Sequence, residues 1–212
     1  MSINNTFSKI FCISLKKRED RRIKIKNHLD LLNIDFDFFD AIDGREIKNL
    51  PTNINPGEMG CILSHLEIYK KAASEKLGNY LIIEDDCEFD IDVNNKFIEY
   101  YSEVPQDWKL IYFGGNHNGT QFKMTSPHVH RLHRTYTTHC YGVRDGFSEI
   151  LISEIENKIK NIKQIDVELS DIQTKYPCYG FIPHIAWQYD GFSDIVGDYR
   201  NYDFLKKDGR PC

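Results

Sequence analysis

The sequence predicts an α/β fold in which a mostly parallel central sheet is flanked by helices. Short apolar runs alternate with helical patterns over the first half of the chain, which is the order that parallel strands with crossover helices require. A length of 212 residues, with no internal repeat and no Pro/Gly/Ser-rich linker, favours one domain over two. We therefore expect a single domain over residues 1–212.

The first elements are predicted from a buried strand and the charged segment after it. Residues 10–15 form an apolar run typical of a strand covered on both faces. A basic turn at residues 16–22 follows, and then a helix whose inner face we expect to carry Ile25, Leu29 and Leu32. The phenylalanines within residues 36–39 indicate a second strand, which ends at the turn pair Asp43-Gly44.

The most clearly marked helix begins at Asn55. Asn55 can cap the helix, Pro56 suits its first position, and Glu58 lies three residues after the cap, as in a capping box. Apolar residues then recur at helical spacing, namely Met59, Ile62, Leu63, Leu66, Tyr69 and Ala73. The apolar run at residues 80–83 predicts a strand that leads directly into three acidic residues.

The second half of the chain has less regular patterns. We expect strands at residues 108–113 and 180–186, a hairpin within 128–143, and helices over 145–158 and 166–176. In α/β sheets, ligands bind outside the carboxyl ends of the strands. The junction between the strand at 80–83 and the acidic residues that follow it is therefore the expected place for a site.

The overall composition excludes several classes of protein. With 41% hydrophobic and 28% charged residues, the chain can form a normal core, which excludes disorder and a coiled coil. A net charge of −5 and a pI near 5.9 make nucleic acid an unexpected partner. No apolar run approaches the roughly 20 residues that span a bilayer, and the first residues lack a secretory pattern. We expect a soluble, cytoplasmic protein without a transmembrane segment.

The cysteines are expected to be reduced. None of the six lies in a C-x-x-C spacing, and several occupy apolar segments, so we interpret them as small core residues, namely Cys12, Cys61, Cys87, Cys140, Cys178 and Cys212. Two matches to the glycan acceptor pattern, beginning at Asn4 and Asn118, are interpreted as coincidental, since the pattern matters only in a secreted chain.

Three acidic residues, Glu84, Asp85 and Asp86, follow the apolar run at 80–83. Carboxylates at the end of a buried strand repel one another and lose hydration, so a positive charge is expected beside them. Mn²⁺ and Mg²⁺ prefer one or two carboxylates together with phosphate oxygens and water. The triplet predicts a divalent-cation site; the alternative is an acidic loop paired with surface lysines.

The basic turn at residues 16–22 is expected at the same rim as the acidic triplet. Arginines in a fixed turn can bind phosphate or cover a nucleotide base, the alternative being a solvated first helical turn. The sequence has neither a Gly-x-Gly-x-x-Gly nor a Walker-type loop. Any phosphates would therefore be held by a cation and side chains.

Serine and histidine patterns are less specific. Ser64-His65 lacks the Gly-x-Ser-x-Gly context of a hydrolase and lies inside a predicted helix, so packing or donor contact is expected. His128, His130 and His133 show no zinc-site spacing and are interpreted as surface residues.

Together, these segments resemble glycosyltransferase family 25, which includes galactosyltransferases of lipopolysaccharide biosynthesis and collagen hydroxylysine galactosyltransferases. The resemblance covers almost the whole chain in order. Its matching stretches are 13–15 with Arg18, Asp20, Arg21 and Arg22, then 57–65, 81–86, 138–141, 166–169, and Gln188 with 193–195. Residues 57–65 and 81–86 are the specific ones.

The resemblance implies a GT-A fold and an enzyme that transfers a hexose from UDP-galactose or UDP-glucose with inversion. Glu84, Asp85 and Asp86 would hold manganese, or magnesium, on the diphosphate. The implied donor-binding residues are Leu15, Arg18, Arg21, Ser64, His65 and His139, with both histidines lining the cleft. Asp166 would be the base that deprotonates the acceptor hydroxyl, with Glu168 as second candidate. The acceptor would be a lipid-linked saccharide, another glycan or hydroxylysine in a collagen-like chain.

Some positions depart from the family pattern, and two other functions stay open. Ser14 stands where the family usually has Asn, Gly142 replaces a small apolar residue, and the chain ends soon after residue 195. A two-metal phosphoryl-transfer enzyme or nuclease would also place carboxylates at a strand end. A non-catalytic carbohydrate-binding domain is the other alternative, and failure to bind UDP with manganese would favour it.

Overall fold

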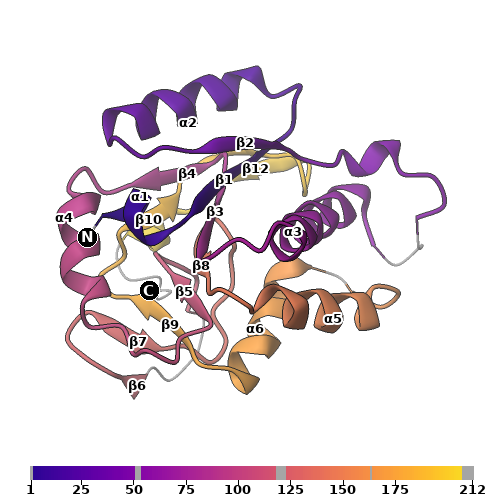
Figure 1. The fold of residues 1–212 in the computed structure, drawn as a ribbon. Coiled ribbons are helices and arrows are strands. Elements are labelled where there is room, and N and C mark those ends of the chain that lie inside the picture. Colours follow the sequence, from indigo (N-terminus) through magenta and orange to yellow (C-terminus); the bar gives the residue numbers. More distant parts are fainter. Residues whose placement is uncertain (1, 51–53, 118–122, 163, 207–212) are drawn as a thin grey trace.

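An eight-stranded mixed sheet forms the centre of the protein (Figure 1). The computed structural model describes residues 2–50, 54–117, 123–162 and 164–206. The strands lie in the order β2 (Asp37–Asp40), β1 (Lys9–Ser14), β3 (Tyr80–Glu84), β8 (Cys140–Val143), β5 (Leu110–Tyr112), β9 (Cys178–Phe181), β7 (Val129–Arg131) and β6 (Lys123–Met124). β8 and β7 run opposite to the other strands, so the predicted α/β fold is confirmed with a mixed sheet.

Helices cover both faces of this sheet (Figure 1). Successive residues of a strand point to opposite faces, so β1 contributes Ile10 and Cys12 to one core and Phe11 and Ile13 to the other. The first core includes residues of α2 (Glu19–Leu31) and α4 (Val93–Tyr101). The second includes residues of α3 (Pro56–Ser74), α5 (Ser148–Lys158) and α6 (Ile165–Lys175).

The remaining elements are short. They are α1 (Ile3–Thr6), the 3₁₀ turns η1 (Gly44–Glu46) and η2 (Asp203–Lys206), and the strands β4 (Cys87–Phe89), β10 (Ala186–Gln188), β11 (Gly191–Ser193) and β12 (Asp198–Arg200). β4 pairs with β10, and β11 pairs with β12, each pair antiparallel. Through the β4–β10 pair, the C-terminal part of the chain reaches back to the segment that follows β3.

The strongest local predictions are confirmed. The Asn55 side chain accepts a hydrogen bond from the Glu58 backbone N–H at 2.8 Å, and the Asn55 backbone N–H donates to the Glu58 carboxylate at 3.3 Å, which completes the capping box. In α2, Ile25 and Leu29 are buried, and Leu32 is buried directly after the helix. These segments fold as predicted because the determining residues are neighbours along the chain.

Two predictions for the second half are wrong in their pairing. Residues 128–143 contain β7 and β8, but these are not a hairpin, since β7 lies between β9 and β6 while β8 lies between β3 and β5. The predicted strand at 180–186 is interrupted at Pro183, which has no N–H to donate, and its two ends belong to β9 and β10. Helix α4 was not predicted, although its buried residues recur at helical spacing.

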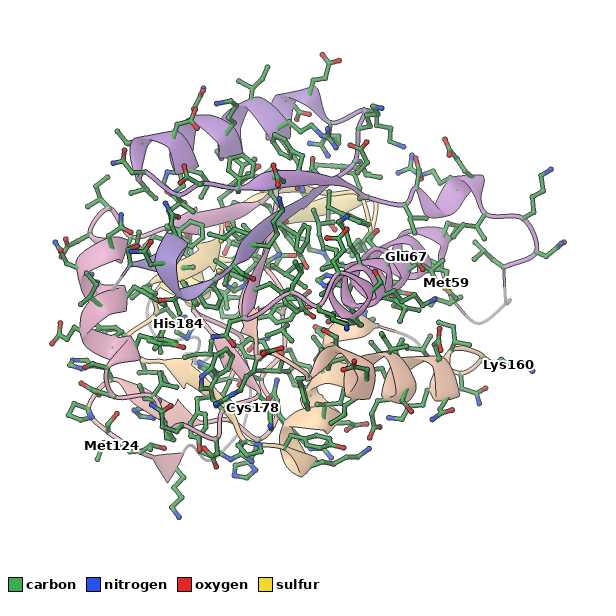
Figure 2. All side chains as sticks on the ribbon, in the orientation of Figure 1. Met59, Glu67, Met124, Lys160, Cys178 and His184 are labelled. Atoms are coloured by element: carbon green, nitrogen blue, oxygen red, sulfur yellow. The ribbon has the colours of Figure 1, made fainter. Side chains whose placement is uncertain are left out.

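Gly142 and the cysteines have simple structural roles. A Cβ atom on Gly142 would lie 2.7 Å from the Phe7 ring and 2.9 Å from Ile111, so a side chain has no room here. The five cysteines within the described residues are free thiols, as expected, and Figure 2 labels one of them, Cys178. Cys212 and the acceptor pattern at Asn118 lie outside the described residues.

The three histidines expected at the surface differ in exposure. His133 is exposed, whereas His128 and His130 are half-buried, and His128 stacks on Tyr100 with a hydrogen bond to Glu103 at 2.7 Å. Among the described residues, the helices are all too short or too polar to cross a bilayer.

Candidate functional site

A solvent-open cavity lies where β1 and β3 end. Its walls are the ends of β1 and β3, the segment 41–45, the first three turns of α3, and residues 193–195. The cavity is thus at the carboxyl edge of parallel strands, where the sequence places the site. Among the predicted site residues, those that line it are Leu15, Arg21, Ser64, His65, Glu84, Asp85 and Asp86.

The segment at 41–45 is held against α3 by close backbone contact. A Cβ atom on Gly60 would lie 2.4 Å from the Ile42 carbonyl oxygen, so only glycine permits this approach. Ser64 Oγ donates to the Gly60 carbonyl at 2.6 Å and accepts from the Ile42 N–H at 2.9 Å. Ser64 therefore fixes one wall of the cavity, and its hydroxyl is already engaged there.

Glu84 joins the acidic triplet to a buried polar chain. Its Oε1 accepts from Thr138 Oγ1 at 2.5 Å and lies 3.3 Å from His65 Nε2. His65 Nδ1 lies 2.7 Å from the Tyr141 hydroxyl, which also bonds Tyr69. Burial raises the pKa of Glu84, but the bonds from His65 and Thr138 outweigh this and lower its pKa overall. Glu84 is therefore a carboxylate whose orientation is fixed.

Asp85 and Asp86 are held differently. Asp85 accepts from Ser14 Oγ and from Arg21, both at 2.7 Å, so each of its carboxylate oxygens has a partner. Within the part of the chain that the structure describes, the Asp86 side chain has only long contacts, 3.4 Å to Gln188 Nε2 and 3.6 Å to Arg21. Burial, followed by the charges of Glu84 and Asp85, raises the pKa of Asp86 to about 7.

Glu84 and Asp86 fit a hard divalent cation, and Asp85 does not. The negative charge around Asp86 lacks a short-range partner, which is the condition that a cation would relieve. Both oxygens of Asp85 are engaged by Ser14 and Arg21, so this carboxylate holds the arginine instead. The predicted set of three carboxylates therefore separates into two potential ligands and one positioning residue.

The basic turn contacts the C-terminal segment over the cavity. Arg18 forms ion pairs with Asp20, at 2.8 Å, and with Asp194, and these interactions raise its pKa. Arg21 donates to the Phe192 carbonyl at 2.5 Å and to Asp85. Arg21 lines the cavity, while the Arg18 side chain lies at the contact with Asp194. Asp194 could not be predicted as the partner of Arg18, because the two residues are 176 positions apart.

The loop before β8 connects the acidic triplet to the predicted base. Thr137 has a φ of 72°, a left-handed conformation that is uncommon for a β-branched residue, and its N–H donates to Asp166 at 3.2 Å. The next residue, Thr138, bonds Glu84. Burial raises the pKa of Asp166, and the charge of Glu84 adds to that rise. Strained residues of this kind concentrate at functional sites.

Four predicted site residues, Arg18, His139, Asp166 and Glu168, do not line the cavity. His139 is fully buried, its Nε2 donates to the Ala186 carbonyl at 3.3 Å, and its Nδ1 lies 3.1 Å from Thr137 Oγ1. Burial lowers the pKa of His139 to about 4, so the ring is neutral. Glu168 forms an ion pair with Lys158 at 2.6 Å, between α6 and α5. His139 thus supports the loop, and Glu168 joins two helices.

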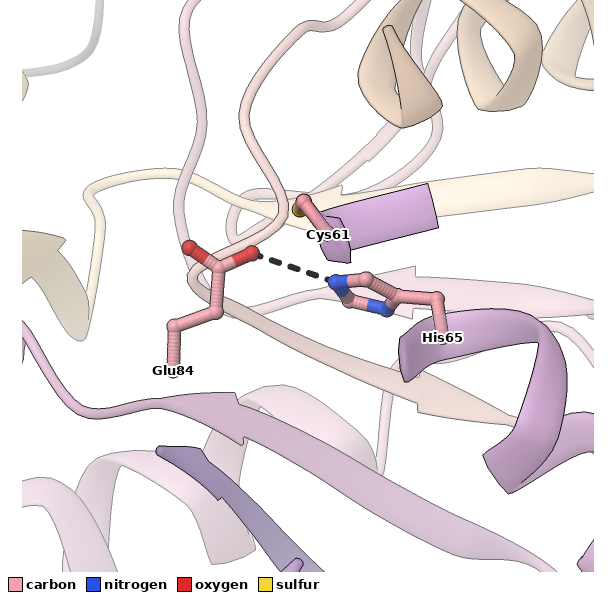
Figure 3. Close-up of side chains that lie close together, drawn as sticks. All are labelled: Cys61, His65 and Glu84. Carbon is pink, nitrogen blue, oxygen red and sulfur yellow. Dashed lines mark hydrogen bonds and ion pairs between the residues drawn. The ribbon is translucent and has the colours of Figure 1, made fainter. Parts of the chain in front are cut away.

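One cavity residue that sequence reasoning did not single out is Cys61. Its Sγ, a ring nitrogen of His65 and a carboxylate oxygen of Glu84 all lie within 4.8 Å of one another (Figure 3). Cys61 and His65 are four residues apart in α3, so they lie on one face of the helix. The Cys-x-x-x-His spacing in a predicted helix was the available sign of this cluster.

Comparisons with known proteins identify the family of the chain. The family model "Glycosyltransferase family 25 (LPS biosynthesis protein)" matches residues 7–166, which is most of the chain. The chain is 33% identical over 129 residues to the human protein "Procollagen galactosyltransferase 2", covering 51% of this chain and 21% of that one. It is 28% identical over 204 residues to the Danio rerio "Procollagen galactosyltransferase 1", covering 84% of this chain and 33% of that one.

The chain therefore spans about a fifth to a third of the length of these curated relatives. Among solved structures, it is similar to one described as a glycosyltransferase "involved in the glycosylation of the major capsid of PBCV-1". The match covers 82% of this chain and 91% of the other chain, with a TM-score of 0.41 and 10% sequence identity.

Proposed function

Because this chain belongs to glycosyltransferase family 25, we propose that it transfers a hexose, galactose or glucose, from a UDP-sugar to an acceptor hydroxyl. The observation that carries the proposal is the cavity at the ends of β1 and β3, where Glu84, Asp86 and Arg21 converge. Two carboxylates and an arginine suit a diphosphate only if a divalent cation neutralises the carboxylates. The names of the procollagen galactosyltransferases favour galactose and a collagen-like or other glycan acceptor.

In this proposal Glu84 and Asp86 hold manganese, or magnesium, which when bound supplies positive charge to the UDP leaving group. Thr138 and His65 keep the Glu84 carboxylate in position, which spares the cost of ordering it when the donor binds. Asp85 holds Arg21 at the cavity wall, from where its guanidinium can fork onto phosphate oxygens. Asp85 is thus a positioning residue in this scheme.

Asp166 is proposed as the base that takes the proton from the acceptor hydroxyl in an inverting displacement. Its raised pKa moves a carboxylate towards the operating pH, where a general base is most effective. The Thr137 N–H fixes one of its oxygens, and the same loop reaches Glu84 through Thr138. Glu168 is less suited, because its carboxylate is paired with Lys158.

Ligand binding tests the proposal without knowledge of the acceptor. UDP together with Mn²⁺ should raise the melting temperature, since a ligand at 100 times its Kd stabilises the native state by about 2.7 kcal/mol. UDP without the cation should raise the melting temperature of the wild-type protein much less. UDP together with Mn²⁺ should likewise raise the melting temperature of the Asp86→Ala variant much less. Absence of any shift with UDP and Mn²⁺ would reject the donor site and favour a non-catalytic carbohydrate-binding domain.

A further inference from the structure

The cluster of Cys61, His65 and Glu84 has the composition of a transition-metal site. Their ligand atoms lie within 4.8 Å of one another (Figure 3). The three side chains also line the cavity. Zinc binds sulfur at about 2.3 Å and nitrogen or oxygen at about 2.0–2.2 Å, so small side-chain movements bring the three atoms to one ion. Three protein ligands with a fourth position open to solvent is a common zinc arrangement.

The residues around the cluster already orient its ligands. The Tyr141 hydroxyl, 2.7 Å from His65 Nδ1, leaves Nε2 facing Glu84. Thr138 donates to Glu84 at 2.5 Å. Metal-binding histidines are usually fixed by such a partner through their second ring nitrogen. The contact that an ion would replace, between His65 Nε2 and Glu84, is the longest of these at 3.3 Å.

We propose that Cys61, His65 and Glu84 form a site for a thiophilic divalent cation, Zn²⁺, which has only Glu84 in common with the proposed hard-cation site. The cysteine decides the selectivity, because sulfur ligands select zinc whereas carboxylates and water suit magnesium and manganese. The thiol loses its proton to solvent as the zinc–sulfur bond forms. Zinc binding at this site depends on these three residues alone.

Sharing of Glu84 gives the site a consequence for activity, and this part rests on the proposed function. When a Glu84 oxygen ligates zinc, the Glu84 carboxylate can no longer hold the manganese ion that we propose it binds together with Asp86. Zinc should therefore inhibit manganese-dependent transfer, and removal of the sulfur should relieve the inhibition.

Cobalt binding tests the site directly, because Co²⁺ replaces zinc and gives a thiolate-to-metal absorption band. The wild-type protein should show the band, Cys61→Ser should lack it, and Cys178→Ala, which removes a buried thiol in β9, should retain it. The Zn²⁺ affinity of Cys61→Ser should fall at least about tenfold, since loss of a residue that only orients a ligand already costs about 10- to 100-fold.

Circular dichroism would verify that each variant is folded, and Cys61→Ala serves if the serine variant is not. An undiminished cobalt band in a folded Cys61 variant, or no band in the wild-type protein, would overturn the site. In turnover assays, each protein's rate is expressed relative to its own rate without zinc. The Zn²⁺ concentration for half inhibition should then be at least about tenfold higher for Cys61→Ser than for the wild-type protein. A protein without transferase activity would still give the cobalt result, so the two proposals fail separately.

Discussion

Buried polar groups lie both in the cavity at β1 and β3 and in the interior beside β5 and β9, and Asp86 is held less closely than the network around His117. His117 lies 2.7 Å from His184 and 2.8 Å from Thr135, and Gln173 exchanges two hydrogen bonds with the Thr135 backbone. In the cavity, the side-chain contacts of Asp86 with the described residues are 3.4 Å or longer. A buried carboxylate with only long contacts costs stability, which supports the ligand role proposed for Asp86.

The first prediction concerns the proposed base, where the largest effect is expected. Asp166→Asn keeps the shape of the side chain but removes its ability to accept a proton, so kcat should fall about 10²- to 10⁴-fold. UDP affinity should be unchanged, because Asp166 does not line the donor cavity. Unchanged kcat in this variant would remove Asp166 from the chemistry.

The second prediction concerns the packed interior. Phe97 is fully buried and its ring lies 5.4 Å from that of Phe113. Phe97→Ala should lower the free energy of unfolding by about 3–5 kcal/mol, because it leaves a cavity among aromatic rings. Denaturant titration would measure this loss. The folded fraction should keep its turnover number, in contrast to the cavity variants, and a selective loss of kcat would show that the two regions are not separable.

The third prediction concerns the wall of the cavity. Ser64→Ala leaves the Ile42 N–H without its acceptor and should cost about 1–3 kcal/mol of stability. Because the segment at 41–45 lines the cavity, the KM for the donor should rise as well. Ser74→Ala, on the exposed end of the same helix, is the matched control. Equal effects of the two substitutions on KM would contradict a role for Ser64 in shaping the cavity.

The fourth prediction is the smallest. Glu168→Gln removes an ion pair with a partly exposed lysine, Lys158, and should cost less than about 1 kcal/mol. Turnover should be unchanged, which would separate Glu168 from Asp166 as candidates for the base. A loss of kcat comparable to that of Asp166→Asn would reverse the assignment.

The same comparison explains what the sequence could predict. The helix that begins after Asn55 and the strand that ends at Glu84 were predictable, because capping and apolar runs are local. The position of the cavity followed from the general rule for strand ends. The sequence also contains Cys61 and His65 four residues apart in a predicted helix. That spacing indicates a metal site only once Glu84 is known to lie beside them.

Long-range contacts decided what the sequence could not predict. Asp85 has the same residue type and nearly the same position as Asp86, yet Ser14, 71 residues away, and Arg21 occupy its oxygens. His139 fits the family pattern, but the Ala186 carbonyl holds its ring inside the core. The wrong hairpin at 128–143 has the same cause, since its two strands find other partners across the sheet.

The most direct test of the account is the release of UDP from a panel of UDP-sugars by the wild-type protein, Asp86→Ala and Asp30→Ala. Asp30 is a surface carboxylate of α2 that pairs with Lys26, so it controls for loss of charge. We predict manganese-dependent turnover in the wild-type protein and Asp30→Ala, and a loss of at least about 100-fold in Asp86→Ala with the fold intact. Manganese-dependent turnover retained in Asp86→Ala would contradict the assignment of the site.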